Sequence, residues 1–385
     1  MGDGSVLEKR TVLVEGQRIV KISNGNQTLP RGAERIGLNG GCLMPGLIDS
    51  HVHLCGDGSS DPLASMVNDS RPLLTLKTAE HARQTLMGGV TTVRDMGGVD
   101  LIDLAVRDAV ASGLIPGPRI LASGRLVCMT GGHGWPLGRE ADGPEEVRRA
   151  AREQIKAGAD LVKLMATGGV MTPGVEPGSA QFTEEELRAG VEEAHKAGRR
   201  TATHAQGTQG VLNALRAGID TVEHGFFLDE ECLEIMIDQG VFFVPTLAAL
   251  YHIEKAGIEA GIPEYMVDKA GRTRSAQVDS VTRAREAGVR IAMGTDASTP
   301  FNLHGQNGQE LGLMVDNGFS PGEAIVAATQ VSAACLGLEE ELGTVEEGKL
   351  ADLIVVNGNP LDNIGLLADP KNIPLVTQAG KKVKS

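Results

Sequence analysis

The chain has 385 residues, of which 41% are hydrophobic and 22% charged, and its formal net charge is −14 with no basic block beyond the terminal KKVK. This length and hydrophobic content suit a soluble globular protein with one large barrel or two domains. The negative charge argues against binding to nucleic acid or to an anionic membrane. The 51 glycines exceed the usual share of roughly 7% and indicate many tight turns.

Cysteine usage and the N-terminal composition indicate where the protein resides. Five cysteines are dispersed without CxxC spacing, which is typical of reduced thiols rather than of a disulfide framework. The N-terminal segment has no apolar run long enough for a signal peptide, and nowhere are about 18 consecutive residues apolar. We therefore expect a cytoplasmic protein without a membrane anchor.

Between residues 42 and 340, short apolar or β-branched runs alternate with amphipathic stretches rich in Ala, Glu and Arg. The predicted strands are, in chain order, CLMPGLIDSHVH, VTTVRDMG, RILASGRL, DLVKLMATG, RTATHA, TVEHG, VFFVPTL and RIAMGTD. The predicted helices include residues 75–89, 144–159, 183–198 and 207–219, several of which end in glycine. Eight such units predict an α/β fold, namely a (β/α)8 TIM barrel. A doubly wound open sheet is the alternative, but no GxGxxG follows the first strand.

The two chain ends have a different pattern from the middle. Residues 5–38 and 343–384 alternate apolar and polar residues, with turn signals and little helical periodicity. We expect them to pair in one small β-sandwich domain. The predicted domains are therefore residues 1–41 with 341–385 for the sandwich, and residues 42–340 for the barrel.

Residues with metal-ligand chemistry fall at the carboxyl ends of the predicted strands, where the active sites of such barrels are assembled. They are His51, His53, Lys163, His204, His224 and Asp296. A single strand-end histidine is more often a packing residue, but here four of nine histidines fall on one rim. Imidazole and carboxylate suit Zn²⁺ and similar divalent ions.

Lys163 is unusual in this set, because a protonated ammonium repels a cation. It contributes to a metal site only if it is deprotonated, or if its amine has reacted with CO₂ to give a carbamate whose two oxygens can bridge two ions. Burial beside a cationic site favours the neutral amine that this reaction needs.

Six segments, taken in order, resemble those of the amidohydrolase superfamily of metal-dependent hydrolases. They are PGLIDSHVHL, GVTTVRDMGG, DLVKLMATGG, THAQG, TVEHG and GTDAS. The similarity covers nearly the whole chain and is closest in character to the branch of Xaa-Pro dipeptidase (prolidase)-like and imidazolonepropionase-related proteins. The resemblance implies a homo-oligomer. Relatives usually have a further strand ahead of a segment like MGDGS, so the resemblance implies that this strand is missing or that the start is truncated.

The resemblance further implies a site with two divalent metal ions, for which zinc is the first expectation. His51 and His53 with Asp296 would hold the more buried ion, and His204 and His224 the more exposed one. Members with a single metal, such as many deaminases, lack the lysine of the fourth strand. Its presence here favours a binuclear hydrolase.

Carbamylated Lys163 and a hydroxide would bridge the two ions. Coordination lowers the pKa of a bound water from about 15.7 to roughly 7, so that a hydroxide exists at neutral pH. Asp296 would accept the proton of this nucleophile and pass it to the leaving amine, as general base and then general acid.

The loop CMTGGHGWP after the third strand contains His133 and the only tryptophan, Trp135. In the dipeptidase-like relatives a histidine of this loop contacts the carbonyl or the oxyanion of the substrate, and the resemblance implies this role for His133. A solvent-facing loop histidine is the alternative. Those relatives often have a tyrosine after the histidine of the sixth strand, whereas this chain has Phe226 and Phe227, which offer no hydroxyl.

Four further residues are candidate substrate contacts: Tyr251 after the seventh strand, His304 after the eighth, and Arg125 and Arg139 beside the third-strand loop as cations for a carboxylate. For His304, as for His252, an ordinary loop position is an equal alternative.

Other polar residues have structural interpretations. His81 and His195 fall in polar helical stretches and are expected to face solvent. Arg94 and Asp95, at the end of the second strand, are expected to form a supporting ion pair.

Three functions remain open at this point. The first is hydrolysis of an amide in a small molecule, an Xaa-Pro dipeptide or another N-acyl amino acid. The second keeps the site and changes the substrate to a carbamate, urea, lactone or organophosphate. The third is a catalytically silent scaffold, which typically loses metal ligands, whereas all six positions are filled here.

Overall fold

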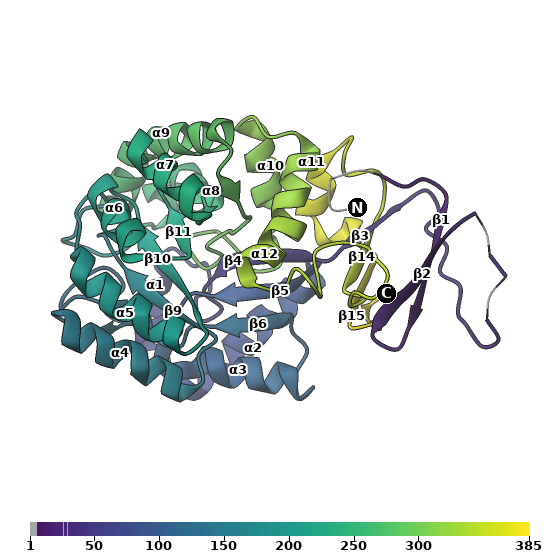
Figure 1. Cartoon of the computed structure of the whole chain (residues 1–385), viewed down its shortest axis with the longest axis horizontal. Coiled ribbons are helices and arrows are strands. Elements are labelled where there is room, and N and C mark those ends of the chain that lie inside the picture. The colour runs from purple at the N-terminus through teal and green to yellow at the C-terminus, as the bar shows by residue number, and fades with distance from the viewer. Residues whose placement is uncertain (1–5, 26, 29) are drawn as a thin grey trace.

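The computed structural model describes residues 6–25, 27, 28 and 30–385 of the chain. The MGDGS start, residues 1–5, before which the resemblance implies a missing strand, lies outside this range. Parallel strands form a (β/α)8 barrel with helices around it, as the sequence predicts, and small antiparallel sheets from the chain ends lie to one side (Figure 1).

The barrel strands are found at all eight predicted positions. Seven strands make one sheet in the order β13-β12-β11-β10-β9-β7-β8, and three make a second in the order β4-β5-β6. Their bounds are β4 Leu47–Val52, β5 Val90–Asp95, β6 Arg119–Ala122, β7 Val127–Cys128, β8 Arg139–Glu140, β9 Leu161–Met165, β10 Arg200–Ala205, β11 Thr221–His224, β12 Phe242–Val244 and β13 Arg290–Ile291.

Backbone hydrogen bonds link the two sheets at both junctions. The N–H of Asp160, just before β9, donates to the carbonyl of Ala122 in β6 at 2.8 Å. At the other junction the N–H of Asp296 donates to the carbonyl of His51 in β4, also at 2.8 Å. The barrel therefore closes, and the segment after β13 lies against β4.

Three predicted strands differ in extent from the structure. The first divides at Gly46: Cys42–Pro45 forms β3, which pairs antiparallel with β14 (Leu353–Val356) outside the barrel. Gly46 permits this change of sheet, since a Cβ there would come within 2.2 Å of the Thr91 hydroxyl oxygen. The third predicted strand, residues 119–126, is regular only over Arg119–Ala122 as β6, with β7 beginning just after it at Val127, and the eighth is regular only over Arg290–Ile291.

Helices cover the outside of the barrel, and the predicted ones are present. Their bounds are α1 Pro62–Asn68, α2 Arg71–Met87, α3 Ile102–Ala111, α4 Pro144–Ala157, α5 Glu184–Lys196, α6 Thr208–Ala217, α7 Glu230–Gln239, α8 Leu247–Ala256, α9 Glu264–Ala287, α10 Gln309–Asp316, α11 Pro321–Val326 and α12 Ser332–Leu336. Gly158 and Gly218 end α4 and α6 with φ of 97° and 90°, a backbone conformation that favours glycine. No helix in the described part of the chain is long and apolar enough to cross a membrane.

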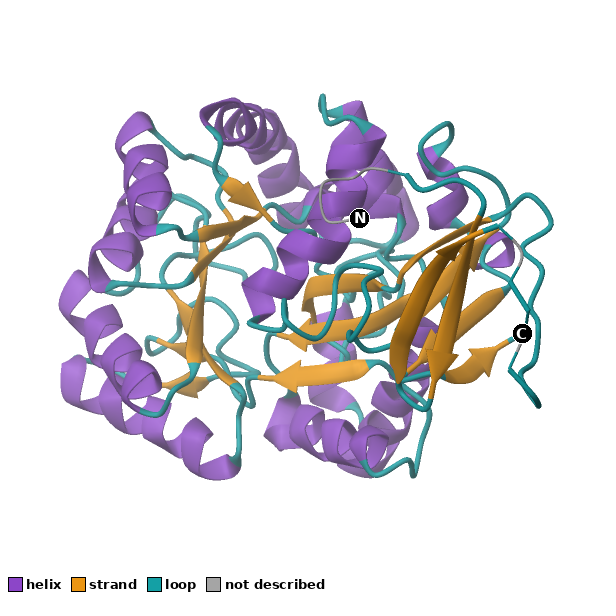
Figure 2. Ribbon diagram, turned by 45° about the vertical axis from the view of Figure 1, so that its right-hand side comes forward, coloured by secondary structure: helices purple, strands orange, loops and turns teal. Residues whose placement is uncertain are grey.

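The chain ends form small antiparallel sheets, as predicted. A hairpin of β1 (Arg10–Glu15) and β2 (Arg18–Asn24) lies beside a sheet in the order β16-β15-β14-β3, with β15 at Leu375–Gln378 and β16 at Lys381–Lys384 (Figure 2). Ile19 of the hairpin is buried together with Ala351 and Leu353, so an apolar contact joins the hairpin to the C-terminal segment. The limits of the predicted domains stay a prediction. All five cysteines are free thiols.

Candidate active site

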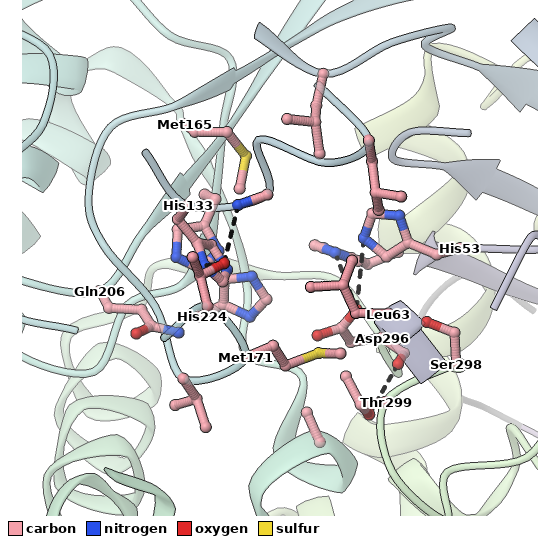
Figure 3. A pocket seen from close by; sticks show the side chains of 18 of the residues that line it. His53, Leu63, His133, Met165, Met171, Gln206, His224, Asp296, Ser298 and Thr299 are labelled. Atoms are coloured by element: carbon pink, nitrogen blue, oxygen red, sulfur yellow. Dashed lines mark hydrogen bonds and ion pairs between the residues drawn. The ribbon is translucent and has the colours of Figure 1, made fainter. Parts of the chain in front are cut away.

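A cavity opens at the carboxyl ends of the barrel strands and contains all six predicted ligand-type residues. Its empty volume, counted to the open mouth, is about 780 Å³. Figure 3 shows His133 and His224 on one side of this space and His53 and Asp296 on the other. The residues predicted from separate strand ends are thus brought to one place.

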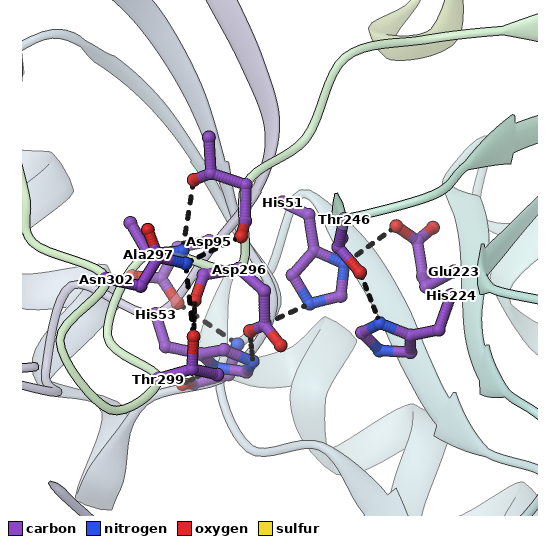
Figure 4. Close-up of polar contacts among 12 residues, drawn as sticks. His51, His53, Asp95, Glu223, His224, Thr246, Asp296, Ala297, Thr299 and Asn302 are labelled. Atoms are coloured by element: carbon purple, nitrogen blue, oxygen red, sulfur yellow. Dashed lines mark hydrogen bonds and ion pairs between the residues drawn. The ribbon is translucent and has the colours of Figure 1, made fainter. Parts of the chain in front are cut away.

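His51, His53 and Asp296 form the tightest group. His51 and His53 are one residue apart around the end of β4, and their rings lie 5.5 Å apart between centroids. Oδ1 of Asp296 lies 3.5 Å from Nε2 of His51 and 3.6 Å from Nε2 of His53 (Figure 4). One ligand atom from each of the three residues lies within 4.8 Å of the others, which is compatible with a shared ion.

His204 at the end of β10 and His224 at the end of β11 form the second group. Their ring centroids lie 4.5 Å apart, and the ring of His224 lies 5.0 Å from that of His51. The two groups therefore face the same cavity, and the neighbouring rings of His51 and His224 connect them.

Each of these four histidines has one ring nitrogen held by the protein. The contacts are His51 Nδ1 to Glu223 Oε2 at 2.8 Å, His53 Nδ1 to the Gly97 carbonyl at 3.0 Å, His204 Nε2 to the Gly168 carbonyl at 2.9 Å, and His224 Nδ1 to Thr246 Oγ1 at 2.7 Å. Such contacts fix the ring orientation and leave the other nitrogen to a metal. Burial lowers the pKa of each ring, so the neutral form that binds metal is favoured.

The contact that holds His51 belongs to a buried charge pair. Arg94 of β5 donates to Glu223 Oε1 at 3.0 Å, and both side chains are buried. The predicted pair of Arg94 with Asp95 is wrong, because neighbouring strand residues point to opposite faces. Asp95 instead accepts backbone N–H groups of Leu54 and Gly97. The sequence alone did not identify Glu223, because its partner Arg94 is brought to it only when the barrel strands are assembled.

Lys163 of β9 lines the same cavity as the two histidine groups. Its side chain is 1% exposed, and its Nζ has no hydrogen-bond partner among the described residues. Burial lowers the pKa of Lys163 to about 8. A buried amine without a hydrogen-bond partner destabilises the folded state. Lys163 is therefore suited to a site in which a bound group contacts its amine.

Strained backbone occurs where the site residues project. His224 has φ of 72°, Thr246 has φ of 50° and Asp296 has φ of 56°, in a region that residues other than glycine rarely adopt. Strain of this kind persists where the surrounding structure enforces it and is frequent at functional sites. Burial raises the pKa of Asp296 to about 7, the range suited to a group that gains and loses a proton.

His133 lines the cavity beside the second histidine group. Its ring centroid lies 4.3 Å from that of His204, and its Nδ1 lies 2.9 Å from Thr172 Oγ1. Burial lowers the pKa of His133 to about 3, so the imidazole is neutral. The alternative of a solvent-facing loop histidine does not match this partly buried position on the cavity wall.

The other candidate substrate residues lie outside the set that lines the cavity. The Arg125 guanidinium donates to the Gly138 carbonyl, and Arg139 Nε lies 2.8 Å from Glu153 Oε2. Tyr251 lies under Arg274, with 5.7 Å from Cζ to the ring centroid.

His304 lies in a second, smaller histidine cluster. Its Nε2 is 2.9 Å from the Gly56 carbonyl, and its ring stacks on His81 at 4.7 Å between centroids. His81 is partly buried, and its Nδ1 lies 2.8 Å from the Leu54 carbonyl, so the predicted solvent-facing position of His81 is wrong. His195 is exposed, as predicted, and pairs with Asp220 at 2.8 Å.

The cavity wall is largely apolar, and the sequence analysis did not identify it. Its apolar residues come from α1, α8 and several loops: Leu63, Met66, Leu126, Leu137, Met165, Val170, Met171, Phe226, Ala249, Leu250 and Ile253. Among the described residues that line the cavity there is no arginine, and Lys163 is the single lysine.

The barrel, its rim of histidines and the buried lysine are those of a hydrolase of the Amidohydrolase family, whose family model matches residues 42–383, and the chain belongs to this family. Ochratoxinase of Aspergillus niger is 32% identical to this chain, covering all of it and 84% of the relative. A solved Xaa-Pro dipeptidase with bound methionine is 36% identical, with a TM-score of 0.90 over 97% of this chain and 94% of that one.

A further solved relative is a prolidase complexed with N-methylphosphonate-L-proline. It is 33% identical to this chain, with a TM-score of 0.90 over 98% of this chain and 95% of that chain. The protein is thus a hydrolase that acts on C–N bonds.

Proposed function

We propose that this protein is a binuclear metal-dependent amidohydrolase that cleaves the amide bond of an Xaa-Pro dipeptide or another N-acyl amino acid. One observation carries the proposal. Four histidines, each with one ring nitrogen held by the protein, line a cavity that also contains Asp296 and the amine of Lys163, which has no partner among the described residues.

The two ions would be held by separate groups of residues. His51, His53 and Asp296 are suited to one ion, and His204 and His224 to the other. When bound, the ions would lower the pKa of a water molecule and polarise the scissile carbonyl. Zinc is the first expectation, since imidazole and carboxylate ligands suit it.

Lys163 is proposed to join the two groups as a carbamate. Its neutral amine attacks the carbon of CO₂, a nitrogen–carbon bond forms, and the nitrogen loses a proton. The product is an anion, which removes the repulsion between an ammonium and the ions. The lowered pKa of Lys163, caused by burial, supports this reaction because it raises the neutral fraction at neutral pH.

Asp296 and His133 are proposed as the catalytic residues. Asp296 accepts a proton from the attacking water and delivers it to the nitrogen of the leaving group, so an acid and an amine result. His133, which is neutral, donates a hydrogen bond from Nε2 to the carbonyl oxygen as negative charge develops there. The apolar wall excludes bulk water and strengthens both interactions.

Two features bear on the substrate. The names of the solved relatives, an Xaa-Pro dipeptidase and a prolidase, support a dipeptide with C-terminal proline. The wall offers no arginine and no second lysine for a free carboxylate, which favours a neutral carbamate, urea, lactone or organophosphate as the second candidate.

A paired experiment separates these possibilities. Metal-free protein is reconstituted with Zn²⁺ and bicarbonate, its metal content is measured, and the same preparation is assayed against aminoacyl-prolines, N-acyl amino acids and neutral carbamates. We expect two ions per chain and hydrolysis of the amides. One ion with an unmodified Lys163 would contradict the binuclear mechanism, turnover of the carbamates alone would favour the second candidate, and well under one ion per chain would favour a silent scaffold.

A further inference from the structure

The loop between β9 and α5, residues 166–183, forms one wall of the cavity and is folded back on itself. The N–H of Gln181 donates to the Ala166 carbonyl at 2.8 Å, and the N–H of Gly168 donates to the Ser179 carbonyl at 2.9 Å. We call residues 168–176 of this loop the wall loop. It contributes Val170, Met171 and Thr172 to the cavity, and Figure 3 shows Met171 pointing into it.

Helix α9 holds the wall loop with three polar side chains on one of its faces. Tyr265, Lys269 and Arg272 are spaced by four and three residues, which places them along one side of the helix. The Tyr265 hydroxyl donates to the Met171 carbonyl at 3.0 Å, and Arg272 lies 3.1 Å from the carboxylate of Glu176.

Lys269 is the central contact of this face. Its side chain is 4% exposed, and its Nζ donates to the carbonyls of Gly169 at 3.3 Å, Thr172 at 2.8 Å and Val175 at 2.6 Å. An ammonium has three donors, and all three are used here. No carboxylate of the described residues lies within ion-pair distance of it. The charge of Lys269 therefore organises the backbone of the wall loop rather than a side-chain partner.

The wall loop in turn fixes His133. Thr172 Oγ1 accepts the N–H of Gly134 at 3.1 Å, and among the described residues His133 Nδ1, 2.9 Å away, is the acceptor available to its hydroxyl hydrogen. This leaves the proton of the neutral imidazole on Nε2, as a donor. The ring also lies on Gly169, where a Cβ would come within 2.4 Å of Nε2.

We propose that Lys269 is a positioning residue, whose ammonium holds the wall loop so that Thr172 and Gly169 fix the His133 imidazole as a hydrogen-bond donor toward the substrate carbonyl. The proposal rests on the role of His133 in the proposed function. Lys269 is buried and distant in sequence from the six predicted ligand-type residues. Through the wall loop that it contacts, it would contribute to stabilisation of the transition state.

Replacement of Lys269 tests the proposal in steady-state kinetics with metal-reconstituted protein. Lys269→Met should lower kcat by roughly 100-fold, the effect of misplacing a reacting group by about 1 Å, while Lys269→Arg, which retains donors, should recover much of it. Lys156→Met, an exposed lysine of α4, is the matched control and should behave as wild type. In the His133→Ala background Lys269→Met should cost little more, because the effect passes through His133.

Two measurements do not depend on any substrate. Trp135 is the only tryptophan and lies two residues from His133, so its emission and quenching report on this loop. Lys269→Met should shift the Trp135 signal and leave the metal content unchanged, although the Gly168 carbonyl in the same loop contacts His204. If Lys269→Met does not fold, Gly169→Ala should displace the ring directly and reproduce the kinetic loss.

The proposal is overturned by an unchanged Trp135 signal, by loss of metal in step with activity, or by a loss from Lys269→Met that is additive with His133→Ala. A shifted Trp135 signal in a protein that hydrolyses none of the tested substrates would instead refute the proposed function while supporting the contact between Lys269 and the His133 loop.

Discussion

The two sides of the site are held by different kinds of structure. His51 is oriented by Glu223 and Arg94, which all lie on barrel strands and form a buried ion pair. We call these three residues the strand-held side. His133 is oriented instead by a loop hydroxyl, that of Thr172, and we call His133 and Thr172 the loop-held side.

The difference indicates how the family can keep one chemistry and vary its substrates. Barrel strands are the most rigid part of such a fold, and a charge left unpaired among them is strongly destabilising. Loops move and change more easily and are where binding residues concentrate. The strand-held side is therefore suited to metal binding, and the loop-held side to contact with the substrate.

Lys163 lines the cavity that both sides face, and its replacement should have the largest effect. Lys163→Met removes the amine that would join the two metal groups, so kcat/KM should fall by at least roughly 1,000-fold, as expected when a metal site fails. The metal-free variant should melt at a higher temperature than wild type, because a buried unpartnered amine is replaced by a thioether. Metal analysis, kinetics and thermal melting measure these changes. Retention of activity within tenfold would contradict the proposed role.

Breaking the strand-held side should lower both stability and metal affinity. Arg94→Met leaves the Glu223 carboxylate buried without its cation, so the free energy of unfolding should fall by about 3–5 kcal/mol. Metal affinity should fall about 10–100-fold, since His51 loses its fixed orientation. Urea unfolding of metal-free protein and chelator competition provide the two values.

The double variant Arg94→Met with Glu223→Gln is the control for this prediction. Removing both charges should restore most of the stability but not the metal affinity. Single and double variants with equal stability would show that the ion pair does not hold the strand-held side.

The strand-held and loop-held sides also differ in how much of their structure can be predicted from the sequence. The alternation of strands and helices predicts the barrel, and the carboxyl ends of the strands predict which residues share the cavity, because chain order fixes both. The side-chain partners of His51 and His224 are harder to predict from the sequence. Glu223 and Thr246 look like ordinary residues at strand ends until the strands are placed side by side.

The contacts of the loop-held side leave still less signal in the sequence. Lys269 lies in a helix whose polar stripe has the spacing of a solvent-facing surface, and its three carbonyl partners are nearly 100 residues away. Backbone acceptors carry no residue-type signature. The apolar wall is likewise assembled from separate loops, so the sequence could not indicate that Arg125 and Arg139 lie outside it.

The proposed reaction of Lys163 with CO₂ should depend on pH. Its pKa is lowered to about 8 by burial, so the neutral amine increases as pH rises through that value. Metal-free protein is supplied with Zn²⁺ and a constant concentration of dissolved CO₂, and the rate at which it gains activity is measured. This rate should rise roughly 25-fold between pH 6.5 and 8.5, because the neutral fraction of an amine with this pKa rises by that factor. Burial already keeps His51, His204 and His224 neutral across this range, so these ligands should not contribute.

Zn²⁺ binding without CO₂, measured at both pH values, is the control for this experiment. It accounts for Asp296, whose pKa is raised to about 7 by burial and which therefore also loses a proton in this range. An equal CO₂-dependent rate at both pH values would argue against carbamylation of the buried amine.

Thr172→Val should have the smallest effect and tests the loop-held side alone. The change keeps the side-chain shape and removes the hydroxyl that contacts His133 and Gly134, so kcat should fall roughly tenfold and stability by about 1 kcal/mol. Thr172→Ser, which keeps the hydroxyl, should stay close to wild type. Metal content should be unchanged in both variants, because the hydroxyl contacts none of the proposed ligands. Loss of metal from Thr172→Val would mean that the two sides of the site are coupled, and that substrate contacts cannot vary without disturbing the metal ions.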